Sequence, residues 1–210
     1  MPLYKVIEHN KNTTIYIWKI TESLEDLKKS VLLNERSKIR ISNMKSESHI
    51  KGFLAVRELL RIAGYTDNDL FYTEEGKPQL KNNKKITISH SFDFSVIGVS
   101  NSEIGVDIEK NREKIKRIAS KFIGSEQEYL IEANLVEQLT VIWGAKESLF
   151  KIHPNGGLLF IKHLPIEKFD LCNKQTIGHI LKEPFKERYA IYFEIFEGYT
   201  LVYATNEIKC

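Results

Sequence analysis

Two amphipathic segments, each followed by short strand-like segments, limit the folds open to this 210-residue chain. Apolar residues recur at helical spacing from His49 to Ile62 and again from Glu137 to Lys151. Short runs of β-branched and aromatic residues, bounded by turn formers, follow each of these helices. Because this order is not a repeated strand–helix–strand unit, the sequence predicts an α+β fold rather than a doubly wound parallel sheet.

The same plan of a helix followed by strands occurs in both halves, which meet near Ser100. We therefore expect two α+β halves, residues 1–100 and 101–210. Strands joined by short turns are predicted for Leu3–Ile20 and for residues 189–204, where Glu197-Gly198 forms the second turn. Shorter helices are predicted at 112–121 and 126–132.

Charge and cysteine content exclude several classes of protein. The formal net charge is +3, from 31 basic and 28 acidic residues, an excess too mild to require a nucleic-acid partner. No apolar run approaches the roughly 18 residues that a membrane span needs. Two cysteines, Cys172 and Cys210, cannot build a disulfide framework. A cytoplasmic protein in a reducing compartment is expected, with no nucleic-acid and no membrane partner.

The segment Ile104–Glu109 places two carboxylates on one side of a predicted strand. Residues two apart share a face, so Asp107 and Glu109 stand side by side with Gly105, opposite the apolar residues. Two neighbouring carboxylates repel, and a hard cation such as Mg²⁺ relieves that repulsion. Taken alone, however, an Asp-x-Glu tripeptide is more often a solvated strand edge.

A second candidate lies on the last long helix, where Trp143, Glu147 and Lys151 follow one another at four-residue spacing along one stripe. Glu147 could supply a third carboxylate to a metal, and Lys151 could hold a phosphate or assist an incoming nucleophile. The alternative is an exposed Glu–Lys pair of small energetic weight.

Two further candidates point to phosphate binding. Ser89-His90-Ser91 has no acid nearby in sequence to orient the imidazole as a triad base, but hydroxyls and an imidazole can bind a phosphate or pyrophosphate. Basic residues form two separate sets, which suggests a polyanionic substrate on one side and an acidic partner on the other. The sets are Arg36, Lys38, Arg40, Lys45 and Lys51, and then Arg112, Lys114, Lys116, Arg117 and Lys121.

Five motifs, in a fixed order and spacing, carry a resemblance to a known family. They are Gly76-Lys77-Pro78, Ile88-Ser89-His90-Ser91, Gly105-Val106-Asp107-Ile108-Glu109, Phe122-Ile123-Gly124-Ser125-Glu126 and Trp143-Gly144-Ala145-Lys146-Glu147-Ser148-Leu149-Phe150-Lys151. Together they resemble the 4′-phosphopantetheinyl transferase superfamily, in its surfactin-type (Sfp-like) branch. One departure is Thr87-Ile88, where the family often has Phe-Asn before its Ser-His-Ser.

The resemblance implies an activity and a set of roles. The activity is transfer of the 4′-phosphopantetheine arm of coenzyme A to a carrier-protein serine, with release of adenosine 3′,5′-bisphosphate. The implied fold is a pseudo-dimer of two α+β halves with coenzyme A in the cleft between them. By matching positions, Asp107, Glu109 and Glu147 would bind Mg²⁺, or Mn²⁺ in its place. Phosphate groups would contact Lys151 and His90, and the nucleotide would be held by Lys77 and Ser89, with Arg40 and Lys51 as further candidates.

The same resemblance implies a macromolecular partner, an apo acyl or peptidyl carrier protein. Because such carriers have an acidic recognition helix, we expect docking on the basic segment, at Arg112, Lys116, Arg117 and Lys121. Glu147 is the candidate for accepting the serine proton, with Lys151 in support. A chain of two similar halves is expected to work as a monomer.

Two other functions remain open from the residues alone. The three carboxylates could serve a Mg²⁺-dependent nuclease or phosphohydrolase, although the chain has no recognised nucleic-acid motif. Alternatively, the chain could be a non-catalytic adaptor that binds carrier-like domains through residues 112–121.

Overall fold

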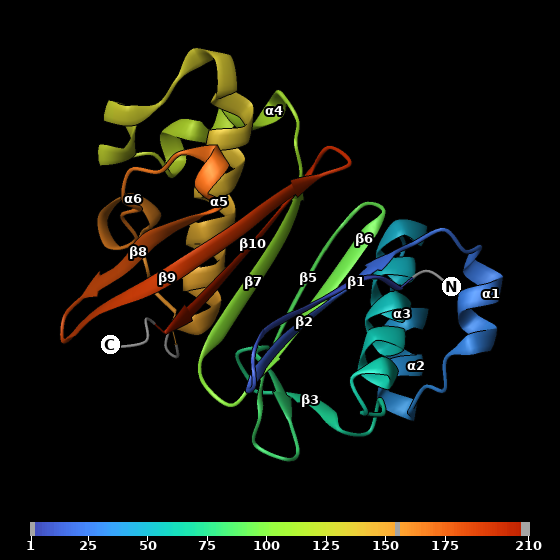
Figure 1. Ribbon diagram of the computed structural model, residues 1–210. Coiled ribbons are helices and arrows are strands. Elements are labelled where there is room, and N and C mark those ends of the chain that lie inside the picture. The colour runs from blue at the N-terminus through green and yellow to red at the C-terminus, as the bar shows by residue number, and fades with distance from the viewer. Residues whose placement is uncertain (1–2, 154–155, 207–210) are drawn as a thin grey trace. The chain divides into compact units, whose positions relative to one another are not determined.

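The structure is a computed structural model in which residues 3–153 and 156–206 are described. The chain divides into two compact units, Met1–Ser102 and Glu103–Cys210, each with its own antiparallel sheet and long helix (Figure 1). Cys210 lies outside the described residues, and Cys172 is a free, exposed thiol. The predicted α+β class is confirmed.

The first unit contains a four-stranded sheet of order β1-β2-β6-β5 and a separate β3–β4 hairpin. Its helices lie between the second and third strands along the chain (Figure 1). In chain order the elements are β1 (Leu3–Asn10), β2 (Thr13–Lys19), α1 (Leu24–Ser30), α2 (Glu35–Ser42), α3 (Glu47–Ile62), β3 (Leu70–Tyr72), β4 (Pro78–Leu80), β5 (Lys85–Ser91) and β6 (Phe94–Ser100).

Helix α3 forms the core of this unit by packing on β6 and β2. Its side chains Leu59 and Leu60 are fully buried and belong to one apolar cluster with Trp18 and Ile97 of the sheet. The helix begins at the N-cap Ser46, whose hydroxyl accepts from the backbone of the first turn, and it is followed by Gly64 at φ +84°. The predicted helix over 49–62 is therefore confirmed.

The second unit has a four-stranded sheet of order β7-β10-β9-β8. Helix α5 packs on β7 and β10, and an apolar cluster that includes Leu139, Ile142 and Val202 fills the space between helix and sheet. The elements are β7 (Ile104–Lys110), α4 (Lys114–Ile118), α5 (Leu135–Ile152), α6 (Phe160–His163), β8 (Gln175–Lys182), β9 (Phe185–Phe196) and β10 (Tyr199–Asn206).

The two units share a topology that no residue-level repeat reveals. In the first, β2 leads to α3, and the later hairpin β5–β6 places its last strand beside β2. In the second, β7 leads to α5, and the hairpin β9–β10 places its last strand beside β7. In both, the long helix packs on that last strand. This common plan agrees with two similar α+β halves.

Two local predictions need correction. Residues 126–132, predicted as a helix, form separate 3₁₀ turns at Ser125–Tyr129 and Glu132–Asn134, because the backbone of Ile131 is extended between them. Strand β8 and helix α2 were not predicted. The hairpins at both ends of the chain are confirmed, the second through Glu197 and Gly198 at positive φ. Within the described ranges, no helix is long and apolar enough to cross a bilayer.

Candidate active site

The two carboxylates of β7 face the long helix of their own unit rather than solvent. Asp107 is buried and Glu109 half-buried. A side chain at Gly105, on the same face of the strand, would overlap the backbone carbonyl of Ser148 in α5. The glycine therefore lets α5 approach β7 closely. A solvated strand edge, the alternative for this segment, is wrong because α5 covers the face that carries the carboxylates.

Lys151, in the last turn of α5, bridges helix and strand. Its Nζ donates to the carbonyl oxygen of Val106 and to Oδ1 of Asp107, both at 2.8 Å. The Lys151 side chain is 28 % exposed and that of Asp107 only 6 %. The ammonium thus neutralises a buried carboxylate while part of the side chain remains open to solvent.

Glu147 lies one helical turn before Lys151 and interacts with the same charges. Burial is the largest cause that raises its pKa, to about 7, and the negative charge of Asp107 is the second. Lys151 opposes the rise, and Glu109 adds to it. Asp107 and Glu109 therefore both act electrostatically on Glu147.

These carboxylates have the chemistry of a Mg²⁺ site. Among residues 3–153 and 156–206, no three His, Cys, Asp or Glu side chains are grouped closely enough to hold a metal ion. The donors nonetheless fit a hard cation, since all are carboxylates; burial first, and then the negative charges of Asp107 and Glu109, raise the pKa of Glu147. The assignment of Asp107, Glu109 and Glu147 to a metal stays a prediction.

The neighbouring residue Lys146 points to the other side of α5 and is fully buried. Its Nζ lies 2.6 Å from Glu126 Oε1 and donates to the carbonyl oxygens of Phe122, at 2.6 Å, and Phe160, at 3.2 Å. Glu126 also accepts from the backbone N–H groups of Gly124 and Ile166. The sequence does not predict this buried ion pair, since a lysine in a helix usually indicates an exposed face.

A cavity of about 200 Å³ lies beside Glu109 in the second unit. Trp143 lines it, so the residue that begins the predicted Trp143–Glu147–Lys151 stripe borders this space. Basic residues at the start of the α4 region, Arg112 and Lys114, belong to the polar part of the lining, with Lys110 and Thr140. The basic segment predicted for docking is therefore adjacent to a candidate metal ligand.

In the first unit, His90 lies at the end of β5 against the first turns of α3. Its ring meets that of His49 edge to face, with centroids 5.9 Å apart. A Cβ atom at Gly52 would lie 2.6 Å from Cδ2 of His90, so the glycine makes room for the imidazole. His49 was not predicted as a site residue, and nothing in its sequence context marks it.

Arg40 and His90 line the same cavity, of about 240 Å³, together with His49 and Tyr72. The guanidinium of Arg40 lies 4.9 Å from the ring centroid of Tyr72 and 5.5 Å from that of Phe53. The structure thus brings two of the predicted nucleotide ligands together around aromatic rings.

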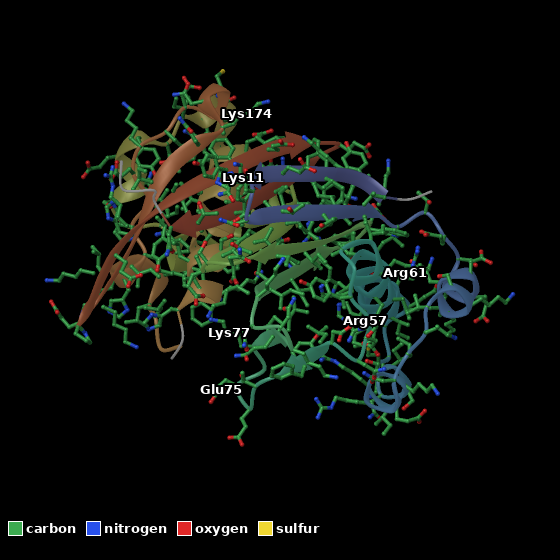
Figure 2. The ribbon with its side chains drawn as sticks, turned by 60° about the horizontal axis from the view of Figure 1, so that its bottom comes forward. Lys11, Arg57, Arg61, Glu75, Lys77 and Lys174 are labelled. Carbon is green, nitrogen blue, oxygen red and sulfur yellow. The ribbon has the colours of Figure 1, made fainter. Side chains whose placement is uncertain are left out.

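The other predicted ligands of the first unit have different surroundings. Lys51, on α3, has its Nζ 3.4 Å from Oε1 of Glu47. Ser89 is buried in β5. Lys77 lies in the turn between β3 and β4, where Figure 2 shows it beside Glu75, and its backbone N–H donates to Thr73. The roles of Lys51, Ser89 and Lys77 remain predictions.

Comparison with known proteins agrees with this geometry. Residues 103–204 match the family model described as the 4′-phosphopantetheinyl transferase superfamily. The chain is also 30% identical, over 171 residues, to the 4′-phosphopantetheinyl transferase gsp of Aneurinibacillus migulanus, an alignment that covers 77% of this chain and 70% of that protein. The chain belongs to the 4′-phosphopantetheinyl transferase superfamily. The resemblance found in the sequence motifs is thereby confirmed.

The match to the transferase superfamily begins at the first residue of the second unit and ends within β10. It therefore includes the carboxylates of β7 and the Glu147–Lys151 turn of α5. The alignment with the curated transferase covers a larger share of the chain than the second unit alone, so it reaches into the unit that carries Arg40 and His90.

Proposed function

We propose that the chain transfers the 4′-phosphopantetheine group of coenzyme A to a serine of an acyl or peptidyl carrier protein, in a Mg²⁺-dependent reaction. The serine oxygen forms a bond to the phosphorus that bears the pantetheine arm. The bond from that phosphorus to the bridging oxygen breaks, and adenosine 3′,5′-bisphosphate leaves. The cluster of Lys151, Asp107 and Glu147 is the observation that carries this proposal.

Glu147 is the proposed acceptor of the serine proton. Its pKa of about 7 suits a general base, which works best when its pKa is close to the ambient pH. These causes act in the metal-free chain: burial first, and then the charge of Asp107, favour the protonated form of Glu147, whereas a Mg²⁺ ion on the same carboxylate would oppose them. An ordinary exposed glutamate would be a weaker base by more than two pKa units.

Lys151 is the proposed source of positive charge for the phosphate oxygens. It is held by Val106 and Asp107 before substrate arrives, so little reorganisation is needed. Mg²⁺ held by Asp107, Glu109 and Glu147 would supply further stabilisation of the charge that develops on the diphosphate. We infer a divalent ion because three neighbouring carboxylates offer the oxygen ligands that a hard cation such as Mg²⁺ prefers.

Residues of the first unit are the proposed ligands of the nucleotide. A cavity that combines the guanidinium of Arg40, the imidazole of His90 and the ring of Tyr72 suits a group with both phosphates and a purine base. Lys77, Ser89 and Lys51 extend this set. We propose that a phosphate contacts His90.

The proposed carrier partner docks on the basic segment at α4. Arg112, Lys116, Arg117 and Lys121 are exposed there, and Lys116 is 3.0 Å from Glu113. Arg112 also lines the cavity that contains Glu109, so a carrier bound to this segment would present its serine beside the candidate metal site. We infer that the chain works as a monomer.

Incubation with coenzyme A, Mg²⁺ and a panel of apo carrier proteins tests the proposal. Mass spectrometry should show a gain of one phosphopantetheine group on a carrier, and chelation of Mg²⁺ should abolish it. Asp107→Ala should remove activity while the circular dichroism spectrum stays that of the wild type. Hydrolysis of DNA or RNA without any carrier modification would instead indicate a nuclease, and carrier binding with no transfer would indicate an adaptor.

A further inference from the structure

Helix α2 carries Arg40 but is attached to its unit mainly by polar contacts. Of its eight residues, Ser37 is the buried one, and the apolar side chain of Ile39 is 61% exposed. A short helix with little apolar contact gains little from packing. We therefore expect the hydrogen bonds at the first turn of α2 to fix the orientation of the helix. The orientation of α2 in turn sets the position of Arg40.

Those hydrogen bonds converge on Asp67, a buried residue between α3 and β3. Its Oδ2 accepts from the backbone N–H of Asn34, the N-cap of α2, at 2.9 Å, and its Oδ1 accepts from the hydroxyl of Ser37 at 3.0 Å. The side-chain amide of Asn34 donates in return to the Asp67 carbonyl, at 2.9 Å. The first turn of α2 is thus tied to one carboxylate from both sides.

Arg57 of α3 supplies the opposite charge. Its Nε lies 2.9 Å from Asp67 Oδ1, and both side chains are almost fully buried, at 4% and 3% exposure. Nη2 of Arg57 also donates to the Ser37 hydroxyl, at 3.3 Å. Buried charge-assisted hydrogen bonds of this kind are directional and costly to leave unmade. They define one orientation of α2 relative to α3.

The Phe53 ring connects this network to the nucleotide cavity. Arg57 has its guanidinium carbon 3.4 Å from the ring centroid, and Arg40 has its own 5.5 Å from the same centroid. Both arginines and Phe53 line the cavity that also contains His90. A shift of α2 would therefore move Arg40 away from the aromatic rings that now support it.

We propose that Asp67, together with Arg57 and Ser37, is a positioning group that fixes α2 so that the Arg40 guanidinium is aligned for the anionic, purine-bearing end of coenzyme A. The inference rests on the proposed function, because it assigns that ligand to the cavity. Asp67 and Ser37 do not line the cavity and are not required to touch the ligand, whereas Arg57, which does line it, joins them to Phe53. Their effect on affinity passes through Arg40.

Calorimetric titration with adenosine 3′,5′-bisphosphate tests the inference without relying on turnover. Asp67→Asn should raise the Kd about three- to tenfold, and Ser37→Ala should raise it less, because it removes one hydroxyl and keeps the ion pair. With a carrier protein, kcat at saturating coenzyme A should stay at the wild-type value. A purely structural role would instead lower the melting temperature and the binding-competent fraction while leaving the Kd of that fraction unchanged.

A double-mutant cycle tests whether Asp67 affects nucleotide affinity through Arg40. In an Arg40→Ala background, Asp67→Asn should cause no further loss of affinity. Arg61→Ala is the matched control: Arg61 lies one turn after Arg57 on α3 (Figure 2), but it is 69% exposed and pairs with Glu58. If Asp67→Asn is too unstable to study, Ser37→Ala carries the same cycle.

The outcomes distinguish the positioning role of Asp67 from the proposed transferase function. An unchanged Kd in the Asp67 and Ser37 variants overturns the positioning role while the transferase function stands. So does a loss of nucleotide affinity on Asp67→Asn that persists in the Arg40→Ala background. A wild-type protein that binds no adenosine 3′,5′-bisphosphate overturns the inference directly. Failure to modify any carrier, with normal nucleotide binding and the predicted cycle, would count against the proposed function alone.

Discussion

Lys151 Nζ lies 2.8 Å from Asp107 Oδ1, and this contact joins the last turn of α5 to the middle of β7. The two residues are separated by 44 positions in the chain, and the close approach at Gly105 allows them to meet. Glu147 lies one turn earlier on the same helix and responds to both charges. A single helix-on-strand contact therefore assembles the acidic and basic parts of the candidate site.

The first prediction concerns the charge of Asp107. Asp107→Asn keeps an oxygen that can accept from Lys151, but it removes one negative charge from the candidate metal site. We expect carrier modification to slow by about 100-fold or more, the scale on which loss of one preorganised electrostatic group acts. Initial rates of carrier mass gain measure the effect. The exposed Glu128→Gln is the matched control, and a near-normal rate for Asp107→Asn would remove this carboxylate from the mechanism.

The second prediction concerns stability and pH through Glu147. Its pKa is raised from 4.5 to about 7 in the folded chain, so the folded state holds a proton that the unfolded state releases. This group's contribution to stability is complete below pH 4.5 and is lost as the pH rises to about 7. In Mg²⁺-free buffer, Glu147→Gln should therefore become more stable relative to the wild type as the pH rises.

Urea unfolding of both proteins at pH 5 and pH 8 measures this difference. Adding Mg²⁺ at pH 8 should stabilise the wild type more than Glu147→Gln, because an ion that binds only the folded state shifts the equilibrium toward it. If the free energy of unfolding changes equally with pH in the two proteins, Glu147 does not titrate between pH 5 and pH 8. No response to Mg²⁺ would contradict the carboxylate site independently of any activity assay.

The sequence predicted the long helices and the two terminal hairpins, because local periodicity and turn chemistry determine them, while the motifs gave the family through resemblance. It did not predict α2, whose residues have no apolar stripe and whose attachment depends on Asp67, 30 positions after Ser37. It also did not predict that Asp107 is buried. Its burial follows from the packing of α5 on β7, a contact between distant segments. The alternation of apolar and polar residues along one strand does not predict such a contact.

The third prediction concerns the buried pair Lys146–Glu126. Lys146→Met would leave the Glu126 charge buried without its cation, at a cost of about 3–5 kcal/mol. Because Glu126→Gln removes that charge, the double variant should lose less than the sum of the single losses. Urea unfolding of the three variants measures this. The exposed pair Lys186–Glu183 is the control, for which Lys186→Met should change little.

The fourth prediction separates stability from binding at Gly52. Alanine favours a helix interior over glycine by about 1 kcal/mol, so Gly52→Ala should not lower the stability of α3 by much. Its Cβ would lie 2.6 Å from the His90 ring, which must then move. If His90 contacts a phosphate, the KM for coenzyme A should rise several-fold while the melting temperature is maintained. An unchanged KM would show that the present position of His90 is not needed for binding.

The fifth prediction concerns the proposed carrier surface. Replacing both Lys116 and Arg117 by Glu reverses two exposed charges on α4 that no apolar core depends on. We expect the KM for the carrier protein to rise about tenfold at low salt, with kcat unchanged, because rim charges mainly affect encounter. The difference from the wild type should shrink at high ionic strength, where the Debye length falls to a few ångströms.

Replacing both Lys28 and Lys29 of α1 by Glu is the matched control for this surface, since both are exposed helical lysines of the first unit and Lys28 also pairs with a glutamate three residues away, Glu25. It should leave the KM for the carrier unchanged. An equal rise in both variants would show that overall charge, and not the α4 surface, governs association. A carrier KM that is insensitive to salt and to both variants would place docking elsewhere on the protein.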